Sequence, residues 1–445
     1  MNYLCLICAV PTVLAGSLKL DFQVNDGRQN NIIKKDNYFN MPLKATDNVG
    51  FYFTELQFGS TNDKIVVLVD TGSADLWVTG DDATCYQRSL NDDVSSGSSH
   101  TSGWSVADAD VCKHFGSFDW EDSTSFNRNS TAFDITYADG TFASGFWGYD
   151  QVSIGNVSVD DVSFGVANES SDVMGTLGLG LPGVELLVLS GKKGYENLPQ
   201  KLKNQGIIDR QIYSLYLNEA KARSGTVLFG AIDHEKYRNE LVTVPLLTNV
   251  SLFRNQVMIN MDSLAGMSTK KKGPVPTTQL LNDTIILLDS GTTITGFLKE
   301  VLTKLAESLG GGGTLNSNYY VDCRLVPKAS LQMTVKNATV NMSMSDFVYK
   351  YYDQCYLSFT EMDSQGEYII FGQDFLRHLY VVYDFDGLEV SLAQAYYTKK
   401  EDIEVVGADG KFNRTSSKHK GAASLNAVSI RLLVVSLIVS IGMIV

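Results

Sequence analysis

Alternating apolar and polar positions dominate the middle of the chain, and this period of two predicts a mostly β protein. Two extended runs, over 49–58 and 64–69, are joined by a turn at 60–62, where Ser, Thr and Asn favour a change of direction. Similar strand-like segments follow over 132–166, 212–259 and 367–396.

Four segments depart from this alternation. Residues 297–309 carry Leu and Val at helical spacing and end at a run of glycines, so they predict a helix, and 187–205 predicts a second one. Residues 85–130 are rich in Ser, Asp and Asn and predict a long surface loop. Residues 398–421 are mostly charged and polar and predict a stalk.

The N-terminal residues have the pattern of a secretory leader. Residues 1–15 contain a short apolar run that closes on small residues, which predicts a signal peptide. Lys34 and Lys35 form a basic pair, so we expect 16–35 to be a short pro-segment that is cut after Lys35. An ordinary exposed lysine pair is the alternative interpretation.

The C-terminal residues have the pattern of a signal for a glycosylphosphatidylinositol (GPI) anchor. Residues 432–445 form an apolar tail, preceded by a spacer and by small residues at 421–423. This order predicts lipid attachment at Gly421 or Ala422, with 422–445 as the attachment signal. A tail-anchored helix is the alternative, but the apolar run is shorter than the ~20 residues that a spanning helix needs.

Chain length, net charge and cysteine content further limit the class of protein to which the chain can belong. A chain of 445 residues exceeds one ordinary core, which favours two lobes, and a net charge of −14 speaks against nucleic acid as a partner. Two of the six cysteines lie in the N-terminal apolar run, and the other four suggest two disulfides. Nearness in sequence favours Cys85–Cys112 and Cys323–Cys355, although four cysteines allow three pairings.

Other sequence signals concern modification and metals. No zinc-type spacing of Cys or His occurs in the mature region, so we expect neither a metal nor a cofactor. Eight sequons fit passage through the secretory route. They are Asn129, Asn156, Asn168, Asn249, Asn282, Asn337, Asn341 and Asn413.

The candidate chemistry lies in a motif that occurs twice, 219 residues apart. Each copy is an apolar strand followed by Asp, a hydroxyl residue, Gly and a second hydroxyl residue. The first copy ends in Asp70, Thr71, Gly72 and Ser73, and the second in Asp289, Ser290, Gly291 and Thr292. One such copy is most often an ordinary turn after a strand, but two copies with matching apolar approaches favour a paired site.

A pair of carboxyl groups has a specific chemical use. Two carboxylates in close contact cannot both ionise cheaply, so they share one proton. The charged member draws a proton from a water molecule, while the protonated member donates to a peptide carbonyl. Such a pair can therefore supply acid and base action at one site.

Through these motifs the chain resembles the pepsin-like aspartic peptidases over most of 50–396. The resemblance implies a mostly β, bilobal fold with a central cleft and a β-hairpin flap, with lobes at 36–230 and 231–397. It makes Asp70 and Asp289 the catalytic dyad. The resemblance also implies supporting residues. Thr71 and Ser290 would tie the two loops together, Ser73 and Thr292 would bond the outer carboxylate oxygens, and Gly72 and Gly291 would allow tight turns. Residues 177–178 and 371–372 would lie in strands threaded behind each loop.

Further motifs follow in the order expected for that family. Residues 135–141 resemble the flap hairpin, in which Tyr137 would be the flap tyrosine and would bond toward Trp77. Asp139 and Gly140 form a strong turn signal. Asp139 could pair with a substrate Lys or Arg, and a role in the turn alone is the alternative.

Within the family, the GPI-type tail, the short pro-segment with its basic end, the acidic balance and the 85–130 insertion resemble fungal yapsins, with candidapepsins next. This implies a secreted, monomeric aspartic endopeptidase that cleaves peptides or proteins next to Lys or Arg. It would be held at the plasma membrane by a GPI lipid or transferred to the cell wall. A catalytically silent peptide-binding or cell-wall protein on the same fold is the alternative.

Overall fold

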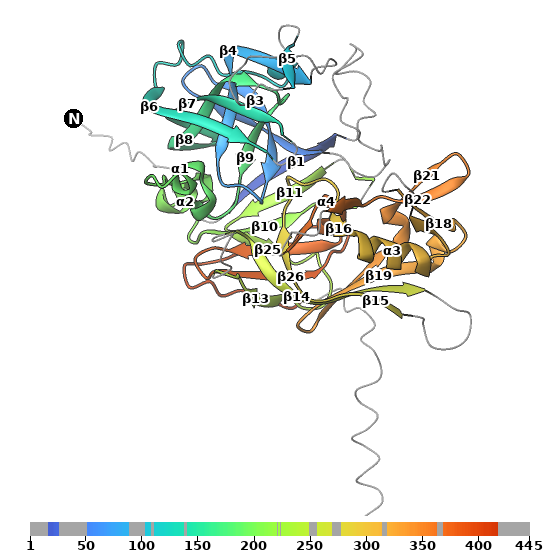
Figure 1. The fold of residues 1–445 in the computed structure, drawn as a ribbon. Coiled ribbons are helices and arrows are strands. Elements are labelled where there is room, and N and C mark those ends of the chain that lie inside the picture. The colour runs from blue at the N-terminus through green and yellow to red at the C-terminus, as the bar shows by residue number, and fades with distance from the viewer. Residues whose placement is uncertain are drawn as a thin grey trace, which may run out of the picture.

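The fold is mostly β, as the alternation predicted, and Figure 1 shows two lobes joined by a layer of strands. The computed structural model describes residues 17–25, 51–88, 103–107, 111–137, 140–219, 221–222, 224–248, 256–268, 277–313, 318–362 and 368–416.

The largest sheet runs through the middle of the molecule and continues into the first lobe. Its central part contains β13 (Val242–Pro245), β26 (Glu389–Gln394), β25 (Leu379–Asp384), β10 (Ile212–Tyr216), β11 (Ser224–Phe229), β1 (Leu18–Asn25) and β2 (Phe51–Phe58), in that order. In the first lobe it continues with β3 (Asp63–Asp70), β9 (Gly175–Gly178), β4 (Leu76–Arg88), β8 (Val157–Ser170), β7 (Phe142–Ile154) and β6 (Asn127–Thr136).

The second lobe is built on smaller sheets. One has the order β20 (Ala338–Ser343), β19 (Ala329–Val335), β14 (Met258–Ser268), β15 (Thr277–Leu288) and β24 (Ile369–Phe371). Beside it lie β16 (Gly296–Leu298) with β23 (Thr360–Met362), and β17 (Gly312–Gly313), β18 (Tyr319–Val321), β22 (Gln354–Leu357) and β21 (Val348–Tyr351). Within the described residues the helices are α1 (Leu186–Leu189), α2 (Leu198–Asn204), α3 (Lys299–Ser308) and α4 (Gln373–Leu376), with short 3₁₀ turns at Val111–Lys113, Pro182–Val184, Val326–Lys328 and Met344–Phe347.

Each strand that leads into a motif has a parallel strand beside it. Asp70 at the end of β3 is in register with Gly178 of β9, and Leu288 at the end of β15 is in register with Phe371 of β24. These are the two strands that the resemblance placed behind the loops. The two halves of the chain therefore deliver their motifs by the same local arrangement.

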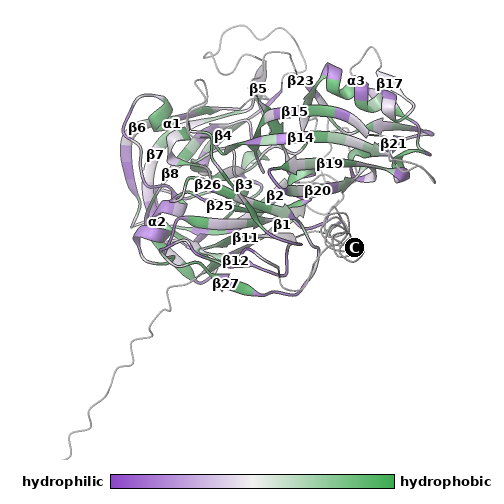
Figure 2. Cartoon of the chain, turned by 90° about the horizontal axis from the view of Figure 1, so that it is seen from below, coloured by the Kyte–Doolittle hydropathy of each residue, from purple (hydrophilic) through white to green (hydrophobic). Residues whose placement is uncertain are grey.

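The core consists of inward-facing apolar side chains from the alternating strands. In the first lobe, the ring of Phe164 lies 5.1 Å from that of Phe58 and 5.4 Å from that of Phe118. All three side chains are fully buried. Figure 2 shows hydrophobic residues along the strands and hydrophilic residues gathered toward loops and outer faces. The alternation thus buries one face of strands such as β20, whereas β9, β10 and β25 are buried on both faces.

Both disulfide pairings predicted from sequence nearness are present. Cys85 bonds to Cys112 and Cys323 bonds to Cys355, with a Cα–Cα distance of 5.4 Å in each case. The first bond lies within the segment predicted as a long loop. Part of that loop is in fact regular, because β4 extends to Arg88 and pairs with β5 (Trp104–Val106).

The two predicted helices have different outcomes. The helix expected at 297–309 is present as α3. The helix expected at 187–205 is divided into α1 and α2. Gly191 adopts a left-handed backbone with φ +75°, which ends α1, and the side chain of Asn197 accepts a hydrogen bond from the backbone of Gln200 to begin α2.

The prediction of a stalk at 398–421 is wrong for residues 398–416, the part of this segment that the structure describes. β27 (Ile403–Val405) pairs with β12 (Ala231–Asp233), and Val406 is fully buried. Ser416 is also buried, and its backbone nitrogen donates to the carbonyl of Asn239. The short apolar alternation in 403–406 was hidden by the charged residues around it, and it folds onto the domain.

The ends of the chain are described only in part. β1 lies within the predicted pro-segment and pairs with both β2 and β11. The side chain of Lys19 in β1 forms an ion pair of 2.7 Å with Glu401. Lys35, Gly421, Ala422 and the predicted signal peptide lie outside the described residues.

We expect Val406→Ala to lower the free energy of unfolding by roughly 2 kcal/mol, because it removes buried apolar volume from the contact with β12. Val405→Ala is the matched control, because Val405 is 44% exposed and its loss should have little effect. Urea denaturation of the two variants measures the difference. Equal, small effects would mean that 403–406 does not pack on the domain.

Candidate active site

The two motif loops meet at the junction of the lobes and exchange hydrogen bonds. The backbone nitrogen of Thr71 donates to Ser290 Oγ at 3.0 Å, and the backbone nitrogen of Ser290 donates to Thr71 Oγ1 at 2.9 Å. Thr71 Oγ1 in turn donates to the carbonyl of Leu288, and Ser290 Oγ donates to the carbonyl of Val69, both at 2.9 Å. Each buried hydroxyl is therefore both donor and acceptor, so the contact leaves neither hydroxyl unsatisfied.

The carboxyl groups of Asp70 and Asp289 receive matching hydrogen bonds from their own loops. In each case a glycine nitrogen donates to Oδ1 at 2.8 Å and a hydroxyl donates to Oδ2, at 2.6 Å for Asp70 and 2.7 Å for Asp289. The donors are Gly72 and Ser73 for Asp70, and Gly291 and Thr292 for Asp289. These bonds fix the orientation of both carboxyl groups.

Each carboxyl group packs against the glycine of the opposite loop. A Cβ atom added to Gly72 would lie 2.6 Å from Asp289 Cγ, and one added to Gly291 would lie 2.6 Å from Asp70 Cγ. Any larger residue would collide with a carboxyl group, so glycine is required at both positions. The structure thus brings the two halves of the repeat together as one site.

The surroundings of this pair favour a protonated carboxyl group. Burial, and then the neighbouring charge of Asp70, raise the pKa of Asp289 well above its usual range. Both causes act in the same direction, because each makes a second negative charge costly. The pair can therefore hold one proton at a pH where exposed carboxyl groups have lost theirs.

Tyr137, the predicted flap tyrosine, is hydrogen-bonded to Trp77 as the sequence predicted. Trp77 Nε1 donates to the hydroxyl of Tyr137 at 2.8 Å, and that hydroxyl donates to Thr176 Oγ1 at 3.1 Å. Burial raises the pKa of Tyr137, so its phenol stays neutral. Gly140 has φ +81° in the turn of the hairpin. Asp139 lies outside the described residues.

Sequence reasoning missed several residues that support this site. Thr176 accepts from Tyr137, and the side chain of Gln373 donates to the carbonyl of Ser290 at 2.7 Å. Their signal was only their position, since each lies next to one of the threaded strand motifs. An ordinary Thr or Gln at such a position carries no pattern of its own.

A buried acidic cluster behind Trp77 was also missed. The hydroxyl of Tyr195 donates to Asp75 at 2.6 Å, and its backbone nitrogen donates to Glu185 at 3.0 Å. Burial raises the pKa of Asp75 to about 6 and that of Glu185 to about 7. Asp75 also accepts from the backbone nitrogen of Leu186, so the cluster fixes the start of α1 against β4.

The predicted modification sites are at the surface wherever they are described. Seven of the eight sequon asparagines are exposed, and Asn249 lies outside the described residues. Their glycosylation remains a prediction. Among the residues that the structure describes, no group of three or more His, Cys, Asp or Glu side chains could hold a metal ion. Within the same residues, no helix is long and apolar enough to cross a membrane.

Comparison with known proteins identifies the class. The eukaryotic aspartyl protease family matches residues 51–395, so the chain belongs to that family. The chain is 33% identical to secreted aspartic protease 9 of Candida albicans, over 93% of this chain and 91% of that protein. It is 34% identical to aspartic proteinase yapsin-3 of Saccharomyces cerevisiae, over 92% of this chain and 80% of that protein.

A solved structure supports the fold. The aspartic proteinase from Irpex lacteus superimposes with a TM-score of 0.62 at 19% identity, covering 86% of this chain and 98% of that chain. The expected relationship to yapsins and candidapepsins is confirmed at the level of the family, as is the assignment as an aspartic protease.

Proposed function

We propose that the protein is an endopeptidase in which Asp70 and Asp289 hydrolyse peptide bonds through one shared proton. The observation that carries the proposal is the packing of each carboxyl group on the glycine of the opposite loop. A water molecule placed between the two carboxyl groups would lose a proton to the charged member. The protonated member would donate to the substrate carbonyl, and the roles then exchange as the leaving nitrogen is protonated.

The flap completes this proposal. The hydroxyl of Tyr137 is held by hydrogen bonds with Trp77 and Thr176. Its ring can therefore cover a bound peptide while it keeps both hydrogen bonds. A closed hairpin would exclude water from the carboxyl pair, which strengthens the electrostatic effect of each group on the other.

We expect Asp70→Asn and Asp289→Asn each to lower kcat by at least about a thousandfold, because a neutral amide can neither share the proton nor activate water. In the unmodified enzyme, activity should fall as pH rises through the raised pKa of Asp289, because the pair then loses its single proton. A pH–rate profile on a peptide substrate measures this. A statine-type transition-state mimic should inhibit the reaction.

Two results would contradict this mechanism. Full activity with an optimum above about pH 8 would exclude a proton-sharing pair. An Asp70→Asn variant that kept a cell-surface phenotype intact would favour the second candidate, a catalytically silent peptide-binding or cell-wall protein. The hydrogen bonds that each carboxyl group receives from its own loop support the enzyme instead.

The substrate preference is proposed to be for Lys or Arg beside the cleaved bond. Support comes from the similarity to a yapsin and from the acidic balance of the chain. Asp139, at the turn of the flap hairpin in the sequence, is the candidate partner for the basic side chain. A charge pair of this kind discriminates well when it is partly dehydrated.

We expect Asp139→Asn to lower the ratio of kcat/KM for a lysine peptide to kcat/KM for its norleucine counterpart about tenfold. Asp134→Asn is the matched control, because it removes the same charge from an exposed position on β6, the first strand of the hairpin. The two peptides are assayed side by side. If norleucine is preferred by the unmodified enzyme, the proposed preference is wrong while the endopeptidase assignment stands.

The location is proposed to be the cell surface, through a GPI lipid at Gly421 or Ala422. The support is the order of small residues, spacer and apolar tail in the sequence, together with similarity to a secreted aspartic protease. Transfer from the plasma membrane to the cell wall is included in this proposal.

We expect a phosphatidylinositol-specific phospholipase to move the protein from the detergent phase to the aqueous phase, because the lipid would be its only membrane anchor. A variant with Gly421→Lys and Ala422→Lys is the control, since bulky charged residues should prevent attachment. Retention of the phospholipase-treated protein in the detergent phase would indicate an uncleaved apolar tail.

A further inference from the structure

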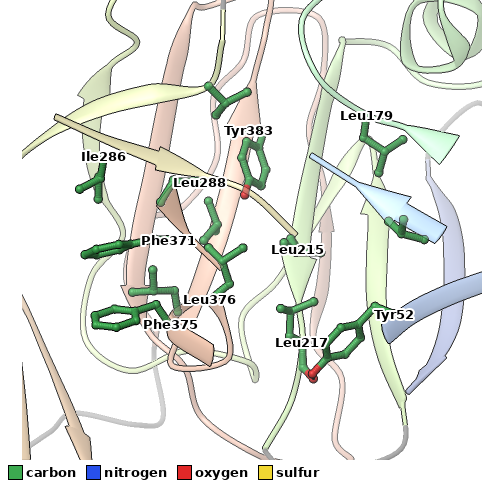
Figure 3. Close-up of a cluster of buried hydrophobic side chains, with 14 of the residues drawn as sticks. Tyr52, Leu179, Leu215, Leu217, Ile286, Leu288, Phe371, Phe375, Leu376 and Tyr383 are labelled. Carbon is green, nitrogen blue, oxygen red and sulfur yellow. The ribbon is translucent and has the colours of Figure 1, made fainter. Parts of the chain in front are cut away.

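Two tyrosines lie stacked beneath the first catalytic loop. Tyr213 of β10 and Tyr383 of β25 are direct partners in the antiparallel register, and their rings are 4.8 Å apart at an angle of 22°. Both side chains are fully buried. Figure 3 shows Tyr383 within the cluster of buried side chains that also holds Leu179 and Leu288.

Tyr213 is linked to Asp70 by two hydrogen bonds in series. Its hydroxyl donates to the carbonyl of Leu179 at 2.9 Å. The backbone nitrogen of Leu179 donates to the carbonyl of Asp70 at 2.7 Å. The peptide that carries one catalytic carboxyl group is therefore supported from the central sheet, by a side chain that does not reach the cleft.

Tyr383 is close to the other functional residue of the same loop. Burial raises the pKa of Tyr383 and the nearby side chain of Thr71 lowers it, while the Tyr383 hydroxyl has no hydrogen-bond partner within the described residues. A buried hydroxyl without a full partner costs free energy, and phenylalanine would fill the same space without that cost. Packing alone therefore accounts for the ring of Tyr383 and leaves its hydroxyl unexplained.

We propose that Tyr213 and Tyr383 are positioning residues, which hold the first catalytic loop in the position that Asp70 needs to share a proton with Asp289. Tyr213 acts through Leu179 on the peptide of Asp70, and Tyr383 offers its hydroxyl to Thr71 when that loop moves. Because the rings are stacked, a shift of one is passed to the other. This inference rests on the proposed role of Asp70 and Asp289.

The test uses three variants: Tyr213→Phe, Tyr383→Phe and the double variant that carries both changes. Each is compared with a control variant, Tyr380→Phe. Tyr380 is the matched control because it lies in the same strand, is fully buried, and stacks on Tyr237 at 5.2 Å. Its oxygen accepts from the backbone nitrogen of Asp233 at 2.7 Å, away from the catalytic loops. All the variants are nearly isosteric, so a general loss of packing is common to them.

We expect Tyr213→Phe to lower kcat about three- to tenfold with KM little changed, since its hydrogen bond to Leu179 is lost while the binding cleft stays intact. Tyr383→Phe should have a similar effect, because it removes the hydroxyl that is proposed to be offered to Thr71. The alkaline limb of the pH–rate profile should move to lower pH, because a looser pair shares its proton less strongly. Tyr380→Phe should lower only the midpoint of thermal unfolding.

The outcomes separate this inference from the function on which it rests. If the unmodified protein hydrolyses peptides and the Tyr213 and Tyr383 variants match Tyr380→Phe in kcat and pH profile, the positioning role is refuted and the endopeptidase assignment stands. If the unmodified protein hydrolyses no peptide, both fall. Should the double variant not fold, the single variants decide.

Discussion

The reciprocal hydrogen bonds between Thr71 and Ser290 are the constraint on which the rest of the structure depends. Each hydroxyl accepts from the opposite loop and donates to the strand behind it, so neither is left unsatisfied in a buried place. If one loop moved away, buried donors and acceptors would lose their partners together, at a cost of ~1–3 kcal/mol for each. This penalty holds the two halves of the chain in one relative position and so places the carboxyl groups in contact.

The surrounding fold follows from that requirement. A loop can be held this firmly only if the strand that delivers it is itself fixed, and β9 and β24 supply that by pairing in parallel beside β3 and β15. Parallel strands need cover on both faces, which explains why these segments are apolar without alternation. The central sheet continues into the first lobe, whereas the second lobe is built on separate sheets and is held to it by the shared buried core and by the bonds between Thr71 and Ser290.

The role of a residue can be predicted from the sequence when that residue belongs to a motif that recurs or that follows in a known order. Asp70 and Asp289 could be recognised because the same order of strand, acid, hydroxyl and glycine occurs twice, and Tyr137 because its motif follows in order. Tyr213 and Tyr383 could not, since a tyrosine in an apolar strand is an ordinary core residue until its surroundings in the fold are known. The hydrogen bonds of Thr176 depend equally on contacts between distant segments.

The errors in secondary structure have a similar cause. The segment 187–205 has helical spacing at Leu198 and Leu202, but one left-handed glycine and the cap at Asn197 divide it. The segment around Val406 is mostly charged and polar, which favours a stalk, but its few apolar residues are enough to add β27 to β12. Short elements that depend on a partner strand leave little trace in local composition.

The hydrogen bonds that Asp70 and Asp289 receive are similar, and Asp289 has one further donor, the backbone nitrogen of Thr292 at 3.3 Å. Both groups have a glycine donor and a hydroxyl donor at similar distances. The raised pKa of Asp289 comes first from burial and next from Asp70, which are effects of the cleft as a whole. A peptide that displaces water from the cleft adds to the first effect and, by lowering the local dielectric, to the second. In the proposed mechanism, substrate binding would therefore strengthen the sharing of the one proton that hydrolysis requires.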